Sequence, residues 1–277
     1  MSRWIALGLK TGVRTTPFPE KTDPGAANVP TAVTVSSRNL VAGAVLAAAR
    51  QCPTGAIKTS GSALEGTLEF DLGLCVMCGR CSRAAPDTFQ TVNDPEVAVR
   101  SRSMLRTSLA WDGHEVAITN GAEPGISAAA VNRTFRRSLH IRHVDAGSSN
   151  ATESELQLLS SPAYDLNRLG LFFTPTPRHA DALLVTGVVT RQMVRPLLET
   201  YEAMPAPKVV IAAGTCAISG GLFQDSLTHR GPLEELLPVD VFIPGSPPSP
   251  LALLHGLLLA VGKAEERFRV LAQDDGT

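Results

Sequence analysis

The sequence predicts two domains of different class, a small α+β domain followed by a larger α/β domain built on a parallel sheet. A compact cysteine motif at residues 75–81, with short apolar segments on either side, indicates the first domain. From about residue 139 onward, strand-like and helix-like patterns alternate, which is typical of a parallel α/β sheet. The length of 277 residues suits about two domains, and a hydrophobic content of 44% is enough to bury a core.

The composition excludes several classes of function. Lys plus Arg is 25 and Asp plus Glu is 26, so the net charge of -1 gives no electrostatic case for nucleic-acid binding. Five cysteines, an odd number with short spacings, suit a reducing cytoplasm better than a secreted disulfide scaffold. The longest apolar runs, residues 41–49 and 251–261, are too short to span a bilayer, and the N-terminus lacks an apolar signal core.

Residues 1–38 are predicted to form an extended arm, because prolines interrupt a polar stretch and only residues 4–9 suggest a short strand. Two interpretations of the arm stay open: it wraps a neighbouring subunit, or it is a partly ordered tail. Residues 93–135 are weakly patterned and are interpreted as a linker, with short strands expected at 96–99 and 115–118.

Between the arm and the linker, residues 39–92 are expected to form the first domain. Small apolar residues at 41–49 predict a short helix that leads into Cys52. A strand at residues 67–71 is expected to lead the chain to Cys75.

Cys75, Cys78 and Cys81 lie at C-x2-C-x2-C spacing on one short loop, so their sulfurs can converge on three corners of a 4Fe–4S cluster. In bacterial-type two-cluster ferredoxins, the last cysteine of each run binds the cluster of the other run. Cys52, which is followed by Pro53, has the position of that last cysteine and completes the ligand set.

The same crossed pattern identifies a second cluster that has been lost. Its four ligand positions would be Ala42, Val45, Ala48 and Ala85, and all four are aliphatic. One complete site therefore survives and one complete site has been erased. The alternatives are disulfides or a zinc site with four thiolate ligands, but zinc ribbons favour two separated C-x2-C pairs. The spacing favours iron–sulfur.

The second half of the chain shows buried-strand runs separated by helical patterns. Three of the strands end in a loop that carries Gly187, Gly214 or Gly245, and these loops should share the carboxyl edge of the sheet. The expected strands are residues 170–173, 182–186, 208–213 and 239–243, and the expected helices are residues 190–204 and 249–262.

At these loops the sequence resembles the small subunit that is shared by formate-hydrogenlyase-type membrane-bound nickel–iron hydrogenases and respiratory complex I, where it is the 20-kDa or B subunit. The resemblance covers roughly residues 136–262. The first part of the chain resembles the ferredoxin-type subunit of the same complexes. The matching stretches in the second half are residues 138–145, 164–170, 177–181, 188–193, 214–221 and 244–248.

The resemblance implies a fusion of two neighbouring subunits: an α+β ferredoxin-like N-terminal domain followed by an α/β flavodoxin-like domain with a parallel sheet. The expected boundaries are an arm at 1–38, a single-cluster domain at 39–92, a linker at 93–135, the α/β domain at 136–265 and a tail at 266–277.

In that family four cysteines hold the cluster nearest the catalytic or quinone site. The positions here are Ser149, Thr152, Cys216 and Ser246, and only Cys216 matches. A hydroxyl is a far weaker ligand for soft iron than a thiolate, so we expect this half to bind no cluster and Cys216 to be a small buried hydrophobe. Glu153 and Glu155 follow where the family has acidic residues linked to proton movement; the alternative is that they are exposed acids at a helix start.

The leading functional hypothesis is an iron–sulfur electron-transfer subunit, with no catalytic residue of its own, that carries one 4Fe–4S cluster at Cys52, Cys75, Cys78 and Cys81. The resemblance implies a hydrogenase-large-subunit or 49-kDa-like partner and membrane antiporter-like subunits, with a cytoplasmic location on the inner membrane through those partners. The alternative is a structural or regulatory subunit whose cluster is a staple or a sensor. A nucleotide-binding enzyme is disfavoured because neither G-x-G-x-x-G nor G-x4-G-K-[ST] occurs.

Overall fold

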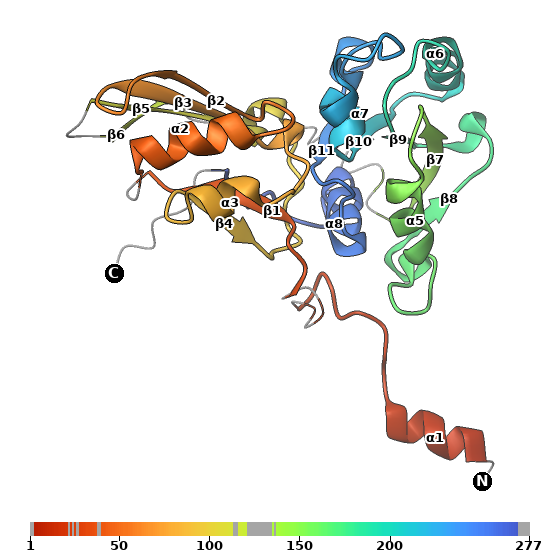
Figure 1. Cartoon of the computed structure of the whole chain (residues 1–277). Helices are drawn as coiled ribbons and strands as arrows, with labels where there is room; N and C mark the ends of the chain where they lie inside the picture. The colour runs from red at the N-terminus through yellow and green to blue at the C-terminus, as the bar shows by residue number, and fades with distance from the viewer. Residues whose placement is uncertain are drawn as a thin grey trace.

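The structure is a computed structural model that describes residues 3–270 except 22, 24, 26–27, 38–39, 113–115, 121–134 and 136. Much of the expected linker (121–134) and most of the expected tail (271–277) lie outside the described residues. Figure 1 shows an antiparallel sheet with helices α2 and α3 on one side of the molecule, and a parallel sheet with helices α5 to α8 on the other.

The second half contains the expected parallel sheet. Its order is β11-β10-β9-β7-β8, and every neighbouring pair is parallel. If the five strands are numbered 1 to 5 in chain order and read from the β8 edge, their order is 2-1-3-4-5. This is the flavodoxin-like order. Strands β9 and β10 are buried along their whole length, as expected for a sheet covered on two faces. The strands are β7 (Leu139–Asp145), β8 (Leu171–Phe173), β9 (Ala182–Thr186), β10 (Val209–Ala213) and β11 (Val241–Ile243).

Helix α8 (Pro250–Ala260) matches the expected last helix and packs on β10 and β11. Ser249 begins the helix, because its hydroxyl accepts a hydrogen bond from the N–H of Ala252 at 3.3 Å. Every residue after Pro250 is buried, which explains why the helix is apolar all round. The other helices of this half are α5 (Ala151–Leu158), α6 (Val194–Ala203) and α7 (Thr215–Ser219).

The first half combines two antiparallel sheets with two short helices. β1 (Ala32–Val35) pairs with β4 (Phe89–Val92), and the second sheet has the order β2-β3-β5-β6. Along the chain the elements follow as β1-α2-β2-β3-α3-β4, and α2 contacts α3. The remaining bounds are α2 (Ala42–Gln51), β2 (Ile57–Gly61), β3 (Gly66–Asp71), α3 (Arg80–Ala84), β5 (Arg106–Trp111) and β6 (Val116–Asn120). Short 3-10 turns occur at η2 (Leu72–Leu74), η3 (Arg102–Leu105), η4 (Leu166–Leu169), η5 (Pro177–His179), η6 (Gly221–Phe223) and η7 (Leu233–Glu235).

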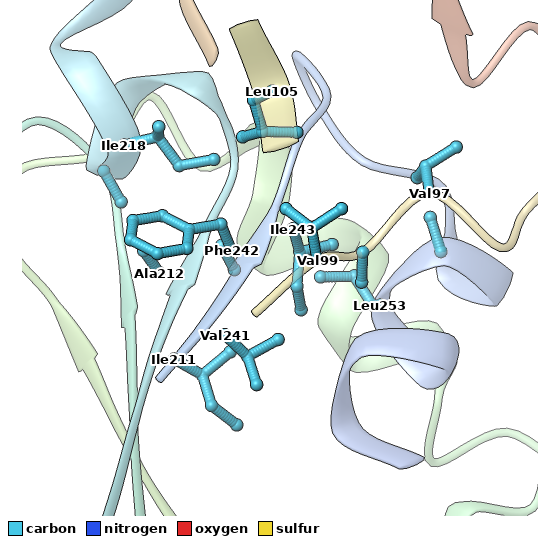
Figure 2. Packing of buried hydrophobic residues seen from close by; sticks show 14 of the residues in the cluster. Val97, Val99, Leu105, Ile211, Ala212, Ile218, Val241, Phe242, Ile243 and Leu253 are labelled. Atoms are coloured by element: carbon cyan, nitrogen blue, oxygen red, sulfur yellow. The ribbon is translucent and has the colours of Figure 1, made fainter. Parts of the chain in front are cut away.

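One hydrophobic core joins the two halves. Val99 and Phe242 exchange backbone hydrogen bonds of 3.0 and 2.8 Å, so the chain that leaves the first half extends the edge of the parallel sheet next to β11. Figure 2 shows Val99 packed beside Ile243 and Leu253, with Val97 farther along the same segment. These side chains are all fully buried. The two halves are therefore held together by apolar burial, whose contribution grows with the area removed from water.

Three sequence predictions differ from the structure. The strand expected at residues 4–9 is wrong, because α1 (Arg3–Thr11) is a helix that ends at Gly12, whose φ is 65°. Good helix formers such as Ala6 and Leu7 occupy this segment, and their propensity favours the helix. The segment expected as a strand at 96–99 forms only the isolated bridge of Val99. Strand β1 lies in the segment expected as an extended arm, and β2, β4, β5 and β7 were also not predicted, whereas β6 matches the strand expected near 115–118.

His255 provides a prediction about pH. Its ring is fully buried on α8, Nδ1 accepts a hydrogen bond of 3.2 Å from the N–H of Ala98, and Nε2 lies 3.1 Å from the carbonyl oxygen of Glu265. Because Nδ1 accepts, the neutral ring carries its proton on Nε2 and donates to that carbonyl. Burial lowers the pKa of His255 from its ordinary value of 6.5.

As the pH falls through 6.5, the unfolded chain therefore takes up a proton at His255 more readily than the folded chain does, and stability falls as the pH decreases. We expect the urea unfolding midpoint to fall less between pH 7 and pH 5 in His255→Gln than in the unaltered chain. At pH 7 the substitution itself should cost about 1–3 kcal/mol, since it disturbs two buried hydrogen bonds. An equal pH-dependent loss in both proteins would contradict this role for His255.

Candidate functional site

The structure brings the four predicted cluster ligands to one place. Cys52 ends helix α2, Cys75 follows the η2 turn, Cys78 lies in the loop after it, and Cys81 lies on α3. All four line a single small pocket, together with apolar side chains that include Phe70. Cys75 and Cys81 are buried, Cys52 is half-buried and Cys78 is exposed. Residues far apart in sequence therefore converge as the spacing predicts.

The erased cluster positions lie in the hydrophobic core. Val45, Ala48 and Ala85 are fully or almost fully buried, and Ala42 packs against the same core. Their aliphatic side chains occupy the space between α2 and α3 where thiols would be needed for a second cluster. Burial of these methyl groups adds hydrophobic stabilisation at the position of the lost ligands.

The loop backbone is arranged to face the sulfurs. Met77 and Gly79 have left-handed φ angles of 54° and 68°, which turn the chain sharply between the cysteines. The N–H of Met77 lies 3.4 Å from Sγ of Cys75 and donates to it. Hydrogen bonds from backbone amides to ligand sulfurs are one of the means by which a protein sets a cluster's reduction potential.

The thiols need a cation in order to ionise together. Burial raises the pKa of Cys75 to about 12, the N–H of Met77 opposes that rise, and the neighbouring thiols Cys81, Cys52 and Cys78 add to it. Burial also raises the pKa of Cys81. A bound metal centre supplies the positive charge that such thiolates lack, which couples its binding to the folding of the loop.

The donor set is four thiols, the number and kind of ligand that a 4Fe–4S cluster takes. In the described part of the chain, no group of three or more His, Cys, Asp or Glu side chains is placed to hold a metal ion. A structural zinc site requires four sulfurs at about 2.3 Å from one ion. A 4Fe–4S cluster is larger and takes one thiolate from each of four positions spread around it. The four thiols at this pocket match the second requirement in number and chemistry.

An ion-pair network supports the base of the cysteine loop. Arg102 donates two hydrogen bonds of 2.7 Å to Asp71, one to each carboxylate oxygen, and Arg106 donates a third at 2.9 Å. The same carboxylate accepts the N–H of Gly73 at 2.8 Å, two residues before Cys75. A Cβ at Gly73 would lie 2.6 Å from the Arg102 guanidinium, so only glycine allows this close contact.

The cysteine loop is also bonded to helix α7 of the second half. Thr215 Oγ1 donates to the carbonyl oxygen of Cys75 at 2.9 Å, and Ser219 Oγ donates to that of Gly73 at 2.7 Å. Both bonds are buried, which makes them costly to leave unmade. No motif in the sequence indicated this docking, because it joins hydroxyls on a short helix to main-chain groups some 140 residues earlier.

The four positions of the second site lie at the carboxyl edge of the parallel sheet. Ser149 precedes α5, Thr152 is in the first turn of α5, Cys216 is in the first turn of α7, and Ser246 follows β11. This edge is next to the β7/β9 pair, where the strand order reverses and where ligands of such sheets bind. The loops therefore share the carboxyl edge of the sheet, as predicted. The four positions there carry one thiol and three hydroxyls.

These residues do not fit an iron–sulfur cluster. Ser149 and Ser246 are exposed. Thr152 lies next to Gly214: if residue 214 had a Cβ, that atom would be 3.1 Å from Oγ1 of Thr152. Cys216 is half-buried, not fully buried as expected, and burial together with the nearby Glu153 carboxylate raises the pKa of its thiol. A single high-pKa thiol and three hydroxyls are a weak ligand set for iron.

Glu153 is not an exposed acid, as the alternative interpretation expected, because only 8% of its surface is exposed. Thr186 Oγ1 donates to Glu153 Oε1, and His143 Nε2 lies 2.8 Å from the same hydroxyl and donates to it. Burial lowers the pKa of His143. Among the described residues, Oε2 of Glu153 has no hydrogen-bond partner. No sequence signal pointed to His143 or Thr186, which lie towards the ends of apolar strands.

In the part of the chain that the structure describes, no helix combines the length and the apolar character that are required to cross a bilayer.

The fold and the loops at its edge define a flavodoxin-like α/β protein with a cysteine-rich domain bonded to it. Residues 150–260 match the family described as NADH ubiquinone oxidoreductase, 20 Kd subunit. The chain belongs to this family, as the resemblance in the sequence indicated.

Three relatives are similar to the chain. Formate hydrogenlyase subunit 7 of Escherichia coli strain K12 is 42% identical over 140 residues, which are 50% of this chain and 55% of that protein. The chain thus spans about half the length of that relative. The probable membrane-bound hydrogenase subunit mbhJ of Pyrococcus furiosus is 46% identical over 133 residues, 48% of this chain and 80% of the relative. The B-type subunit of NADH-quinone oxidoreductase from Citrifermentans bemidjiense is 46% identical over 114 residues, 41% of this chain and 66% of the relative.

Proposed function

We propose that the chain is an iron–sulfur electron-transfer subunit of a hydrogenase-like or complex-I-like oxidoreductase. In this proposal Cys52, Cys75, Cys78 and Cys81 hold one 4Fe–4S cluster, which supplies one-electron transfer when bound. The observation that carries the proposal is the convergence of these four thiols on one pocket, next to a loop whose amide N–H points at a sulfur.

Two further parts of the proposal have separate support. The element order β1-α2-β2-β3-α3-β4 supports a ferredoxin-like domain that ends near residue 92 and begins with β1, earlier than the expected start at residue 39, with the α/β domain at 136–265. The hydroxyls at Ser149, Thr152 and Ser246 support a degenerate second site at which no cluster binds. The chain's own residues then have defined tasks: Asp71 and Arg102 hold the loop, and Thr215 fixes the Cys75 backbone on α7.

The family membership supports a proposal about partners. We infer that a protein of the hydrogenase large-subunit or 49-kDa type binds the second half, together with membrane antiporter-like subunits in the same complex. The names of the relatives support this, since one is a subunit of formate hydrogenlyase and another a probable membrane-bound hydrogenase subunit. The chain would then lie on the cytoplasmic face of the inner membrane through those subunits.

A second candidate function is a structural or regulatory subunit, in which the cluster is a staple or a sensor. The lone Cys216 favours it, because the second half offers no complete ligand set to carry electrons beyond the first cluster. The α/β core would persist without iron, since hydrophobic packing holds it.

A redox titration separates an electron-carrying cluster from a cluster that is a structural staple. We expect the anaerobically purified full chain to show one reversible one-electron transition by electron paramagnetic resonance, within the range of about -700 to +450 mV that such clusters span. Cys216→Ala is the matched control and should titrate at the same potential. A cluster that cannot be reduced, or that is lost irreversibly on reduction, would favour the staple over the electron carrier.

A further inference from the structure

Helix α1 stands clear of the rest of the chain. Figure 1 shows it at the end of an extended segment, away from both sheets. None of its residues is buried. Trp4, Leu7 and Leu9 are 74%, 63% and 75% exposed, which is unusual for large apolar side chains. A helix of nine residues is marginal in water, so a surface that covers its apolar side would stabilise it.

The apolar and basic residues of α1 lie on different sides. At 3.6 residues per turn, Trp4, Ile5, Leu7 and Leu9 spread over an arc of about 200°, with Trp4 and Leu7 towards one end of the arc and Ile5 and Leu9 towards the other. Arg3 and Lys10 are separated by about two turns and lie together in the remaining arc, next to Leu7. The helix is therefore amphipathic, with a tryptophan at one end and cations on its polar side.

The charge of this segment indicates what covers it. Arg3, Lys10 and Arg14 are its charged side chains, and the first acidic residue in the chain is Glu20. The segment is thus cationic, although the net charge of the whole chain is -1. A cationic amphipathic helix with an exposed tryptophan complements an anionic phospholipid surface, where the apolar side enters the headgroup boundary and the cations meet phosphates.

The segment after α1 fixes the place of the helix on the second half. The N–H of Thr16 donates to the carbonyl oxygen of Ala163 at 2.7 Å, and Arg168 Nη2 donates to that of Thr16 at 3.1 Å. Phe18 is buried, with 2% of its surface exposed. Only residues 12–14 separate the helix from this anchored stretch, so a surface that binds α1 also orients the α/β half.

We propose that α1 binds the surface of a membrane that contains anionic phospholipids and lies in the plane of that surface. This contact is direct, in addition to any attachment through partner subunits, and it is independent of the cluster. Because one short helix binds weakly, the contact orients the protein on a membrane and supplements another attachment. A groove on a partner protein would also cover the apolar side, but its affinity for α1 would not require anionic lipid.

The test uses the full chain and vesicles of stated composition, with one set of pure phosphatidylcholine and one containing phosphatidylglycerol. We expect the chain to float with the anionic vesicles at low salt and to remain unbound with the neutral ones. The emission of exposed Trp4 should shift to shorter wavelength on binding, while Trp111, which is 5% exposed, serves as an internal reference. The double variant Arg3→Gln/Lys10→Gln should lose about fivefold in partitioning for each charge removed.

Two control variants distinguish the helix from the general surface. Leu227→Ser removes an apolar side chain that is 86% exposed, and Lys58→Gln removes an exposed cation, and both should float like the unaltered chain. Trp4→Ala should reduce flotation. The proposal is overturned if the chain fails to float with anionic vesicles, if neutral vesicles bind it equally well, or if the control variants lose as much binding as the α1 variants.

Discussion

Replacing Cys75 by alanine is expected to remove all of the iron, whereas replacing Cys216 by alanine is expected to remove none. Cys75 is buried in the four-thiol pocket and its sulfur accepts the N–H of Met77, so no other side chain can take its place. Alanine is chosen because a serine hydroxyl can act as a weak replacement ligand. The measurement is iron per chain together with the visible absorption of the cluster.

Cys216→Ala is a matched control, because burial raises the pKa of that thiol as it does at Cys75. Circular dichroism should show that both variants keep the parallel sheet, since β9 and β10 are held by buried aliphatic side chains. Iron that persists in Cys75→Ala would contradict the assigned ligand set. Loss of iron in Cys216→Ala would show that the lone thiol of the second half is a ligand after all.

Restoring three cysteines at the second site is expected to raise the iron content from about four to about eight per chain. The substitutions are Ser149→Cys, Thr152→Cys and Ser246→Cys, with the native Cys216 as the fourth ligand. The backbone of these loops is well held: the N–H of Gly214 donates to Ile243 and that of Thr215 donates to Gly245, both at 2.8 Å. Ser149 and Ser246 are exposed, so the larger sulfur atoms do not overpack a core.

A second triple variant controls for added thiols that bind iron without a site. Ser62→Cys, Ser160→Cys and Ser226→Cys replace exposed serines that are not among the four positions of the second site, and they should leave the iron content at about four. If the restored variant folds and still holds about four irons, the loops have lost the geometry as well as the ligands.

Strands β8 to β11 were predictable because they are short apolar runs, whereas the central strand β7, which mixes apolar and polar residues, was not among the expected strands. The convergence of Cys52 with the run at 75–81 on one pocket was also within reach of the sequence, since crossed ligation relates these four positions by spacing alone. The lost second cluster followed from the same arithmetic and stays a prediction; Val45, Ala48 and Ala85, three of its four positions, are buried.

Features that depend on tertiary contacts were not predictable. The bonds from Thr215 and Ser219 to the cysteine loop join ordinary hydroxyls to main-chain carbonyls, and neither partner has a sequence signature. Glu153 is buried because α5 packs next to Thr186 at the edge of the sheet. A local sequence pattern cannot predict this contact, because the two residues are far apart in the sequence. Helix α1 was mistaken for a strand because its apolar residues lie close together, so that neither period dominates over so short a segment.

The central claim is that one 4Fe–4S cluster binds in the first half and none in the second. The most direct measurement is the content of iron, acid-labile sulfide and zinc per chain in anaerobically purified protein. The account predicts about four irons, a matching amount of sulfide and no stoichiometric zinc. About eight irons, or about one zinc without sulfide, would contradict it.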